Sequence, residues 1–199
     1  MEIDPHEMDK RSKTIFKDIY PQIACQIIMR CGITKGICID VGSGPGALAI
    51  ALSKAADLNV YSLDISAQMN EIAKKNILEE GLQYRIFPVN GDACKLPFPS
   101  DFADLVVSRG SIFFWEDKES AFKEIYRVLK PGGWAYIGGG FGSKTLENKI
   151  RQSVNKCRGD HINIPKISIT GLKLILNRAP IEDYHILNDS SGLWALFKK

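Results

Sequence analysis

The sequence predicts an α/β fold in which helices cover both faces of a mostly parallel sheet. Along residues 35–140, short apolar runs rich in β-branched residues alternate with longer segments of helical periodicity. This alternation is typical of parallel strands joined by crossover helices. The last two apolar runs are joined at Ser190-Ser191-Gly192, which predicts a C-terminal hairpin and at least one antiparallel edge strand.

The first 32 residues precede this alternation. Residues 1–12 are polar, which predicts a mobile segment, or one that folds over a site only when a ligand is present. Residues 13–32 carry apolar side chains at helical spacing. They predict an amphipathic helix that is bent or restarted at Pro21 and closed by Gly32. This helix is expected to pack across the edge of the sheet or over its ligand end.

The alternating core covers residues 35–140, and a tail of two helices and the hairpin follows over residues 141–199. Ser66 is the expected N-cap of the second core helix, which stops at Gly81. The core is predicted to contain strand 36–41, helix 46–56, strand 59–63, helix 66–80, strand 83–89, strand 103–108, helix 117–130 and strand 134–138. The tail is predicted to contain helices 144–157 and 166–178 and strands 182–188 and 193–198. Residues 1–199 are expected to form a single domain.

Composition narrows the class of protein. Hydrophobic residues make up 45% of the 199 residues and charged residues 25%, an ordinary balance for a soluble chain. The net charge of +3 is small, and Lys and Arg are spread along the chain, so no nucleic-acid partner is predicted. The apolar runs are too short for a membrane span. No signal peptide is expected, and the five cysteines have neither C-x-x-C pairing nor zinc spacing, which predicts reduced thiols, no metal site and a cytoplasmic location.

A glycine loop follows the first strand. The apolar run from Ile37 to Val41 leads into Gly42, Gly44 and Gly46, and an alanine-rich helical segment comes next. A strand, glycine turn and helix in this order bring backbone N–H groups up to an anionic group of a ligand. A plain tight turn between a strand and a helix has the same pattern.

Ligands of open parallel sheets bind beyond the carboxyl ends of the strands. The glycine loop, Asp64, Asp92 and residues 108–111 each follow a predicted strand, so they are expected to surround one crevice. Asp64 lies about twenty residues after the glycine loop, where nucleotide sites place an acid that accepts ribose hydroxyls. It also fits a helix cap. Asp92 can accept a hydrogen bond from an adenine amine, with the Ala93 N–H at a ring nitrogen, or it can form an Asx turn.

Asp40 lies within the first buried strand, two residues before Gly42. A buried carboxylate is costly unless something pairs with it. A ligand ammonium or the backbone amides of the glycine loop would supply that partner. An anion at this point disfavours a dinucleotide and favours a zwitterionic ligand that carries an amino group.

Four motifs in sequence resemble the class I S-adenosylmethionine-dependent methyltransferases, most closely their ubiquinone/menaquinone-biosynthesis-like branch. The resemblance covers residues 35–140. The motifs are Asp40-Val-Gly-Ser-Gly-Pro-Gly46, Leu63-Asp64-Ile65-Ser66, Gly91-Asp92-Ala93 with the segment from Leu96 to Val107, and Arg127-Val-Leu-Lys-Pro-Gly-Gly133. It implies a Rossmann-like three-layer sandwich with a seven-stranded, mostly parallel sheet that ends in an antiparallel hairpin.

The resemblance also implies S-adenosyl-L-methionine as cofactor, S-adenosyl-L-homocysteine as its product, and a role for each matching position. Asp40 would balance the ammonium of the methionine part, and the Ser108-Arg109-Gly110 backbone would line the same part and the sulfonium. Asp64 would hold the ribose, with Asp92 and Ala93 at the adenine. The expected cofactor-binding residues are Asp40, Gly42, Ser43, Gly44, Gly46, Asp64, Ile65, Met69, Gly91, Asp92, Ala93, Ser108 and Arg109.

The expected chemistry is an in-line methyl transfer, for which alignment of the acceptor supplies much of the acceleration. A general base is needed only when the acceptor arrives protonated. None of the three histidines (His6, His161 and His185) lies at a convincing position for one. Tyr20 on the N-terminal helix and Trp115 after the fourth strand are the candidate catalytic residues, although packing in the core explains them equally well.

The leading interpretation is an enzyme that methylates a small-molecule acceptor and acts as a monomer or homodimer. One alternative is a methyltransferase-like protein that binds the nucleoside without catalysis. Another is an NAD-dependent dehydrogenase, since Gly42, Gly44 and Ala47 also fit the dinucleotide fingerprint.

Overall fold

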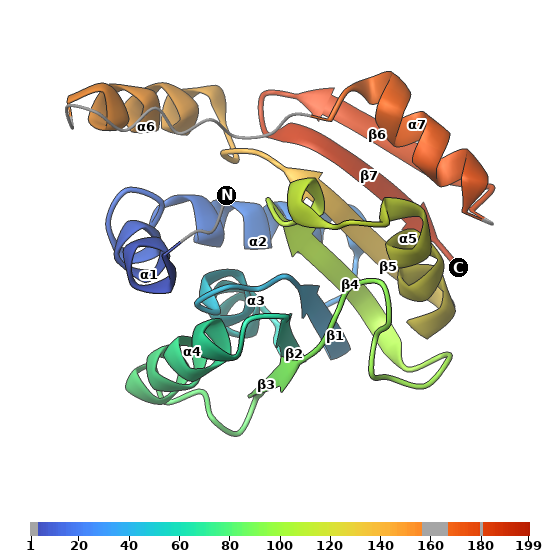
Figure 1. The fold of residues 1–199 in the computed structure, drawn as a ribbon, viewed down its shortest axis with the longest axis horizontal. Helices are drawn as coiled ribbons and strands as arrows, with labels where there is room; N and C mark the ends of the chain where they lie inside the picture. Colours follow the sequence, from blue (N-terminus) through green and yellow to red (C-terminus); the bar gives the residue numbers. More distant parts are fainter. Residues whose placement is uncertain (1–3, 157–166, 180) are drawn as a thin grey trace.

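The computed structural model describes residues 4–156, 167–179 and 181–199. It contains one seven-stranded sheet in the order β3-β2-β1-β4-β5-β7-β6 (Figure 1). The strands are β1 (Lys35–Val41), β2 (Asp57–Asp64), β3 (Ile86–Asn90), β4 (Ala103–Arg109), β5 (Leu129–Gly139), β6 (Tyr184–Asp189) and β7 (Gly192–Lys198). The helices are α1 (Pro5–Lys13), α2 (Ile19–Cys31), α3 (Ala47–Ala55), α4 (Ala67–Glu79), α5 (Lys118–Val128), α6 (Lys144–Lys156), α7 (Ile169–Arg178) and the short 3₁₀ helix η1 (Ile112–Phe114).

The sheet confirms the predicted fold class. Strands β1 to β5 pair in parallel, and β7 pairs antiparallel with both β5 and β6. The order reverses between β1 and β4, which is the point where open α/β sheets bind ligands. In this register, Asp40 of β1 lies opposite Ser62 of β2 and Val107 of β4.

Two apolar clusters form the core, one on each face of the sheet. Ile23 of α2, Leu52 of α3 and Ile77 of α4 belong to the first cluster. Phe122 of α5 and Leu172 of α7 belong to the second. The helices therefore form outer layers on opposite faces, as Figure 1 shows. Within the described ranges, no helix is long and apolar enough to cross a membrane.

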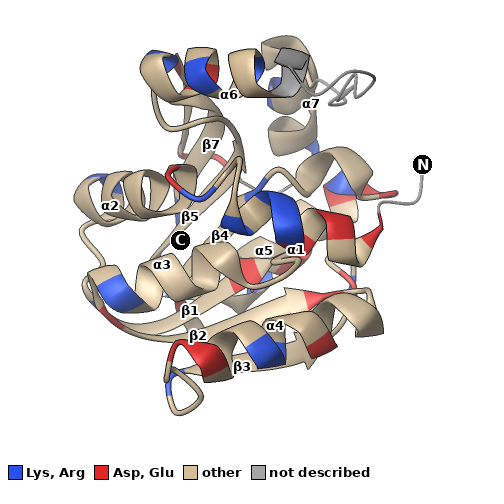
Figure 2. Cartoon of the chain, turned by 90° about the vertical axis from the view of Figure 1, so that its left-hand side faces the viewer, with Lys and Arg blue, Asp and Glu red and all other residues tan. Residues whose placement is uncertain are grey.

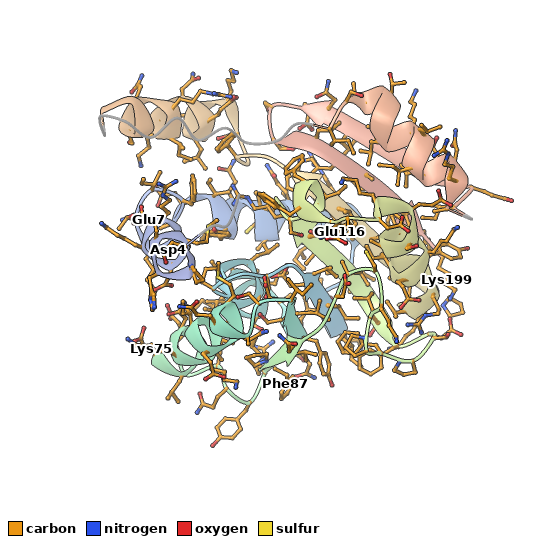
Figure 3. All side chains as sticks on the ribbon, in the orientation of Figure 1. Asp4, Glu7, Lys75, Phe87, Glu116 and Lys199 are labelled. Carbon is orange, nitrogen blue, oxygen red and sulfur yellow. The ribbon has the colours of Figure 1, made fainter. Side chains whose placement is uncertain are left out.

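The N-terminal region differs from its prediction. Pro5–Lys13 forms helix α1, where the sequence pattern predicted a mobile segment. Asp4 caps this helix by accepting a hydrogen bond from the His6 amide over 2.9 Å, and proline fits the first turn because it needs no N–H there. Asp4 and Glu7 lie at the start of α1 (Figure 3). Charged residues of both signs lie along α1 and α4 (Figure 2).

The helix predicted over residues 13–32 is also different. Residues 14–18 separate α1 from α2, and Pro21 lies in the first turn of α2 instead of marking a bend. Gly32 closes α2 in the left-handed conformation, as predicted. The expected cap at Ser66 is present, since its side chain accepts a hydrogen bond from the Met69 amide. Asp117 caps α5 in the same way by accepting from the Ser120 amide.

At the far end of the core, α5 stops at Val128 and β5 begins at Leu129, five residues before its predicted start. Leu129 already pairs with Ala103, so Pro131-Gly132-Gly133 belongs to an irregular first part of the strand. The predicted helices 144–157 and 166–178 correspond to α6 and α7, but residues 157 and 166 lie outside the described residues, as do Cys157 and His161.

Candidate functional site

The carboxyl ends of β1, β2 and β4 meet at one edge of the sheet, and they bring most of the predicted site residues together. The glycine loop follows β1 directly, and its three glycines have φ values of 69°, 54° and 82° at Gly42, Gly44 and Gly46. These values lie in the left-handed region that favours glycine. A Cβ at Gly42 would collide with the side chain of Ser111, whereas no atom lies within 4 Å of a Cβ at Gly44. Gly42 thus serves packing, and Gly44 borders open space.

The loop is fixed to β2 by hydrogen bonds. The amides of Gly42 and Ser43 both donate to the carbonyl of Leu63, over 2.8 and 3.0 Å. The hydroxyls of Ser43 and Ser62 lie 2.6 Å apart. Because Ser62 is fully buried, the loop is anchored in the core before any ligand binds.

Asp64 ends β2 and faces the glycine loop. Its carboxylate accepts hydrogen bonds from the amides of Gly44 over 2.8 Å and Ser66 over 2.9 Å. Burial raises the pKa of Asp64, and these amides oppose the rise. Ile65, which follows, is 71% exposed, whereas Met69 is almost fully buried. Asp64 therefore fixes the turn that leads into α4 and also holds the glycine loop, while its ribose role stays a prediction.

Asp40 is the most unusual group at this edge. It is 1% exposed, and neither of its carboxylate oxygens has a hydrogen-bond partner in the described part of the chain. Burial and the nearby carboxylate of Asp64 raise the pKa of Asp40 to about 7, while the Ala49 amide, which does not reach hydrogen-bond geometry, opposes the rise. A buried polar group without a partner carries a desolvation cost. The position therefore favours a positively charged partner that the protein itself does not supply.

Asp92 and Ala93 follow β3. The Asp92 carboxylate accepts a hydrogen bond from the Cys94 amide over 2.8 Å, which is the Asx turn that the sequence left as an alternative. Asp92 is exposed, and Ala93 is buried. A Cβ at Gly91 would press on Leu63 and Pro97, so that glycine is explained by packing.

Ser108 and Arg109 end β4. Ser108 is buried, and its hydroxyl lies 2.6 Å from the hydroxyl of Ser111, which in turn donates to the carbonyl of Val41 over 2.8 Å. The motif resemblance implied a role only for the Arg109 backbone. Its guanidinium lies over the rings of Phe16 and Tyr20, at 5.6 and 5.3 Å from the ring centroids.

Tyr20 is partly buried and lies close to the charged groups of Asp40 and Arg109. Burial raises its pKa, Asp40 raises it further, and Arg109 lowers it. The helix predicted to pack over the ligand end of the sheet therefore places Tyr20 at this edge. No sequence motif marks the contact between Tyr20 and Arg109, because 89 positions separate them. The sequence showed only that an arginine, Arg109, lies at the end of a core strand, where ligands bind.

Phe113, Phe114 and Trp115, the three aromatic residues after β4, differ in how deeply they are buried. Trp115 is 8% exposed and packs against Phe122, with 6.2 Å between ring centroids. Phe114 is 49% exposed, and Phe113 lies against Gly139. The burial of Trp115 favours the alternative that its ring packs in the core, and its catalytic role stays an untested prediction.

Two of the three histidines lie in the described part of the chain. His6 lies exposed on α1 and His185 exposed on β6, while His161 is outside the described residues. Across the ranges that the structure describes, no three His, Cys, Asp or Glu side chains form a group suited to a metal ion.

Comparisons with known proteins agree on one class. A family model described as a methyltransferase domain matches residues 39–137. A crystal structure from Methanococcus maripaludis, provisionally assigned as an S-adenosyl-L-methionine-dependent methyltransferase, is 45% identical to this chain. That similarity covers 100% of this chain and 97% of the other, with a TM-score of 0.93.

Curated relatives match about half of the chain. The chloroplastic 2-methyl-6-phytyl-1,4-hydroquinone methyltransferase of Spinacia oleracea is 42% identical over 51% of this chain and 28% of its own length. The ubiquinone/menaquinone biosynthesis C-methyltransferase UbiE of Neisseria meningitidis is 37% identical over 48% of this chain and 39% of its own. The chain thus spans well under half the length of these two relatives.

Proposed function

This chain belongs to the class I S-adenosyl-L-methionine-dependent methyltransferases, and we propose that it transfers the cofactor's methyl group to a small-molecule acceptor. The observation that carries the proposal is the buried, unpartnered carboxylate of Asp40 beside the glycine loop. S-adenosyl-L-methionine carries an ammonium on the part that the motif resemblance assigns to this loop. A nicotinamide dinucleotide would bring phosphates instead, which a buried anion repels.

The surrounding groups fit the rest of the cofactor. Each Asp64 oxygen already accepts one amide hydrogen bond, and a carboxylate oxygen has a second lone pair for a ribose hydroxyl. Open space at Gly44 lets the backbone approach the ligand closely. The exposed side chain of Ile65 offers apolar surface for adenine, and Asp92 keeps acceptor capacity beyond its turn.

The bound cofactor would supply a methyl group already activated by a sulfonium. What this chain must do is orient the two reactants and exclude water. Asp40 and Asp64, on neighbouring strands, would fix the methionine part and the ribose of the cofactor relative to the sheet. Tyr20, beside Asp40, would contact either the reacting end or the acceptor, and its raised pKa keeps the hydroxyl protonated near neutral pH. A protonated hydroxyl orients an acceptor by hydrogen bonding and does not act as a strong base.

The small-molecule acceptor is supported by the relatives. Two matched proteins are named for methylation of a hydroquinone and for ubiquinone/menaquinone biosynthesis. The modest net charge of +3 also does not favour a nucleic-acid acceptor, because nucleic-acid-binding proteins usually carry a strong excess of positive charge. The enzyme would act as a monomer or homodimer.

Incubation of the full chain with methyl-labelled S-adenosyl-L-methionine and a filtered small-molecule extract of its source cells tests the proposal. We expect the label in a product that passes the filter and an equal amount of S-adenosyl-L-homocysteine. The Asp40→Asn variant should form much less of both. Binding of S-adenosyl-L-homocysteine with no labelled product would instead support the nucleoside-binding alternative, and binding of NADH alone would support a dehydrogenase.

A further inference from the structure

The turn that carries Asp64 joins β2 to α4 and consists of Asp64, Ile65 and Ser66. Helix α4 lies beside both β2 and β3, as Figure 1 shows. The Asp64 carboxylate accepts one amide on each oxygen, and its remaining direction is set by the backbone of the turn, because the aspartate side chain is short. Whatever fixes this backbone therefore also aims the carboxylate.

Asn70 holds the turn from the side of α4. Its Nδ2 atom donates to the carbonyl of Asp64 over 3.0 Å and to the carbonyl of Ser66 over 3.1 Å. Both carbonyls also accept a backbone amide, from Gly91 and from Asn70 itself, each over 3.1 Å. The side chain is therefore not needed to satisfy these two carbonyls. Its two hydrogen bonds instead tie the turn to the start of α4.

The orientation of the Asn70 amide has a cost. The residue is 5% exposed, and its Oδ1 atom has no hydrogen-bond partner in the described part of the chain. A buried acceptor without a partner carries a desolvation penalty. The reverse orientation would place Oδ1 against two carbonyl oxygens, which have no proton to donate. The amide is thus placed for its two donors, and both of them contact the turn.

Asn90 holds the same turn from the end of β3. It pairs with Asp64 in the parallel ladder between β2 and β3. Its Nδ2 atom donates to the carbonyl of Ile65 over 3.1 Å, and a longer contact of 3.4 Å reaches the carbonyl of Asp64. Together with the bonds from Asn70, each of the three successive carbonyls of the turn accepts a side-chain amide.

We propose that Asn70 and Asn90 are positioning residues for the nucleoside half of the cofactor, which act through Asp64 by aiming its carboxylate at both hydroxyls of the ribose. This inference rests on the proposed function, since it concerns the same cofactor. One carboxylate binds two neighbouring hydroxyls only when both of its oxygens face them. With one lone pair of each Asp64 oxygen already engaged, the direction that remains is narrow. A displaced turn should therefore reduce the selectivity for ribose.

Calorimetry with 5′-methylthioadenosine and its 2′-deoxy analogue measures this selectivity. The two ligands share the base and differ by one ribose hydroxyl. We expect the wild type to prefer the ribose form about 10- to 100-fold, as for a hydrogen bond to a charged group. In Asn70→Ala, which removes two donors, this preference should fall below about threefold. Asn90→Ala should give a preference between those of Asn70→Ala and the wild type.

Asn76→Ala is the matched control. Asn76 is also an asparagine of α4 with 5% exposure, but its amide contacts Asp9 and Pro45 instead of the turn. This variant should lose affinity for both ligands in equal proportion and keep the preference of the wild type. A change in the preference thus separates positioning of the carboxylate from a general loss of stability.

A wild-type preference in a folded Asn70→Ala would overturn the assignment and leave that residue with a structural role. If Asn70→Ala does not fold, a wild-type preference in Asn90→Ala, whose side chain is exposed, would overturn it. A wild type that binds both ligands equally would also overturn it, because Asp64 would then not bind the ribose. If the wild type binds neither 5′-methylthioadenosine nor S-adenosyl-L-homocysteine, the proposed function itself fails.

Discussion

The carboxylate of Asp64 accepts a hydrogen bond from the Gly44 amide over 2.8 Å, so the end of β2 holds the middle of the glycine loop. Gly44 is the loop glycine that borders open space. The acid expected to bind a ribose therefore also shapes the loop that would bind the methionine part. Loss of the Asp64 carboxylate is therefore expected to weaken cofactor binding twice, through the lost ribose contact and through the loosened glycine loop.

Asp64→Asn should weaken S-adenosyl-L-homocysteine binding about 10- to 100-fold in calorimetry. An amide keeps only one oxygen, so one of the two backbone N–H groups would face an NH₂ group. The loss of a hydrogen bond to a charged acceptor corresponds to about 1.5–3 kcal/mol. Asp57→Asn, at the exposed start of the same strand, should bind normally. Wild-type affinity in Asp64→Asn would remove Asp64 from the site.

Asp40 should make the stability of the ligand-free protein depend on pH. Its pKa is about 7 in the folded protein and about 3.9 in an unfolded chain. Between these values the folded state binds more protons, so stability should fall as pH rises from about 4 to about 7 and then level off. The total loss is at most roughly 4 kcal/mol. Urea unfolding should show this slope in the wild type and lack most of it in Asp40→Asn, and parallel curves for the two proteins would contradict the burial of an unpaired Asp40.

Cofactor binding should have the opposite pH dependence. A ligand ammonium favours the ionised carboxylate, so binding releases the Asp40 proton at lower pH. We expect affinity for S-adenosyl-L-homocysteine to be constant above about pH 8 and to fall by up to tenfold per unit below pH 7. Asp40→Asn should bind weakly and without this dependence. Calorimetry in two buffers of different ionisation enthalpy would also reveal the released proton, and its absence at pH 6.5 would exclude an ammonium at Asp40.

Asn76 should couple the N-terminal helix to the glycine loop. Its buried amide nitrogen donates to Asp9 over 2.8 Å and to the Pro45 carbonyl over 2.9 Å, while its oxygen accepts from Lys13 over 2.6 Å. Asn76→Ala should lower the free energy of unfolding by about 1–3 kcal/mol and should also weaken S-adenosyl-L-homocysteine binding. Ser53→Ala, which removes a buried hydroxyl away from the loop, should affect stability alone. Unchanged binding in a folded Asn76→Ala would show that α1 and the loop are independent.

Trp115→Phe should act on stability and leave catalysis unchanged. The Trp115 ring is nearly fully buried against Phe122, so the smaller ring should cost about 1–2 kcal/mol, less than complete truncation. Phe114→Ala, at a half-exposed neighbour, should change stability by less than about 0.5 kcal/mol. Thermal unfolding and kcat/KM of the folded variants provide the measurement. A large fall in kcat with normal stability would restore Trp115 as a candidate catalytic residue.

The local signals of the sequence account for most of the fold. Strand and helix positions followed from periodicity, and Ser66 and Gly32 marked helix ends because capping depends on neighbouring residues. The errors occurred where the pattern is ambiguous. Helix α1 is polar over most of its length and is stabilised by a cap, local ion pairs and contacts with α4. These interactions do not produce a periodic pattern of apolar residues, so the sequence pattern did not predict the helix.

The site was predictable where a motif fixes the position along the chain. Asp40, Gly44 and Asp64 lie together as the motif order implied, because parallel strands bring their carboxyl ends to one edge. Contacts between distant segments were not predictable. The guanidinium of Arg109 contacts Phe16, Tyr20 and Gly140. These residues come from the segment before α2, from α2 and from the end of β5, and no local pattern encodes that arrangement.

A crystal structure of the full chain with S-adenosyl-L-homocysteine would show whether the cofactor binds at Asp40 and Asp64. We expect the ligand beyond the carboxyl ends of β1 and β2, with both ribose hydroxyls within hydrogen-bond distance of Asp64 and the ammonium beside Asp40. A ligand bound elsewhere, or one whose ammonium points away from a still unpaired Asp40, would contradict the account.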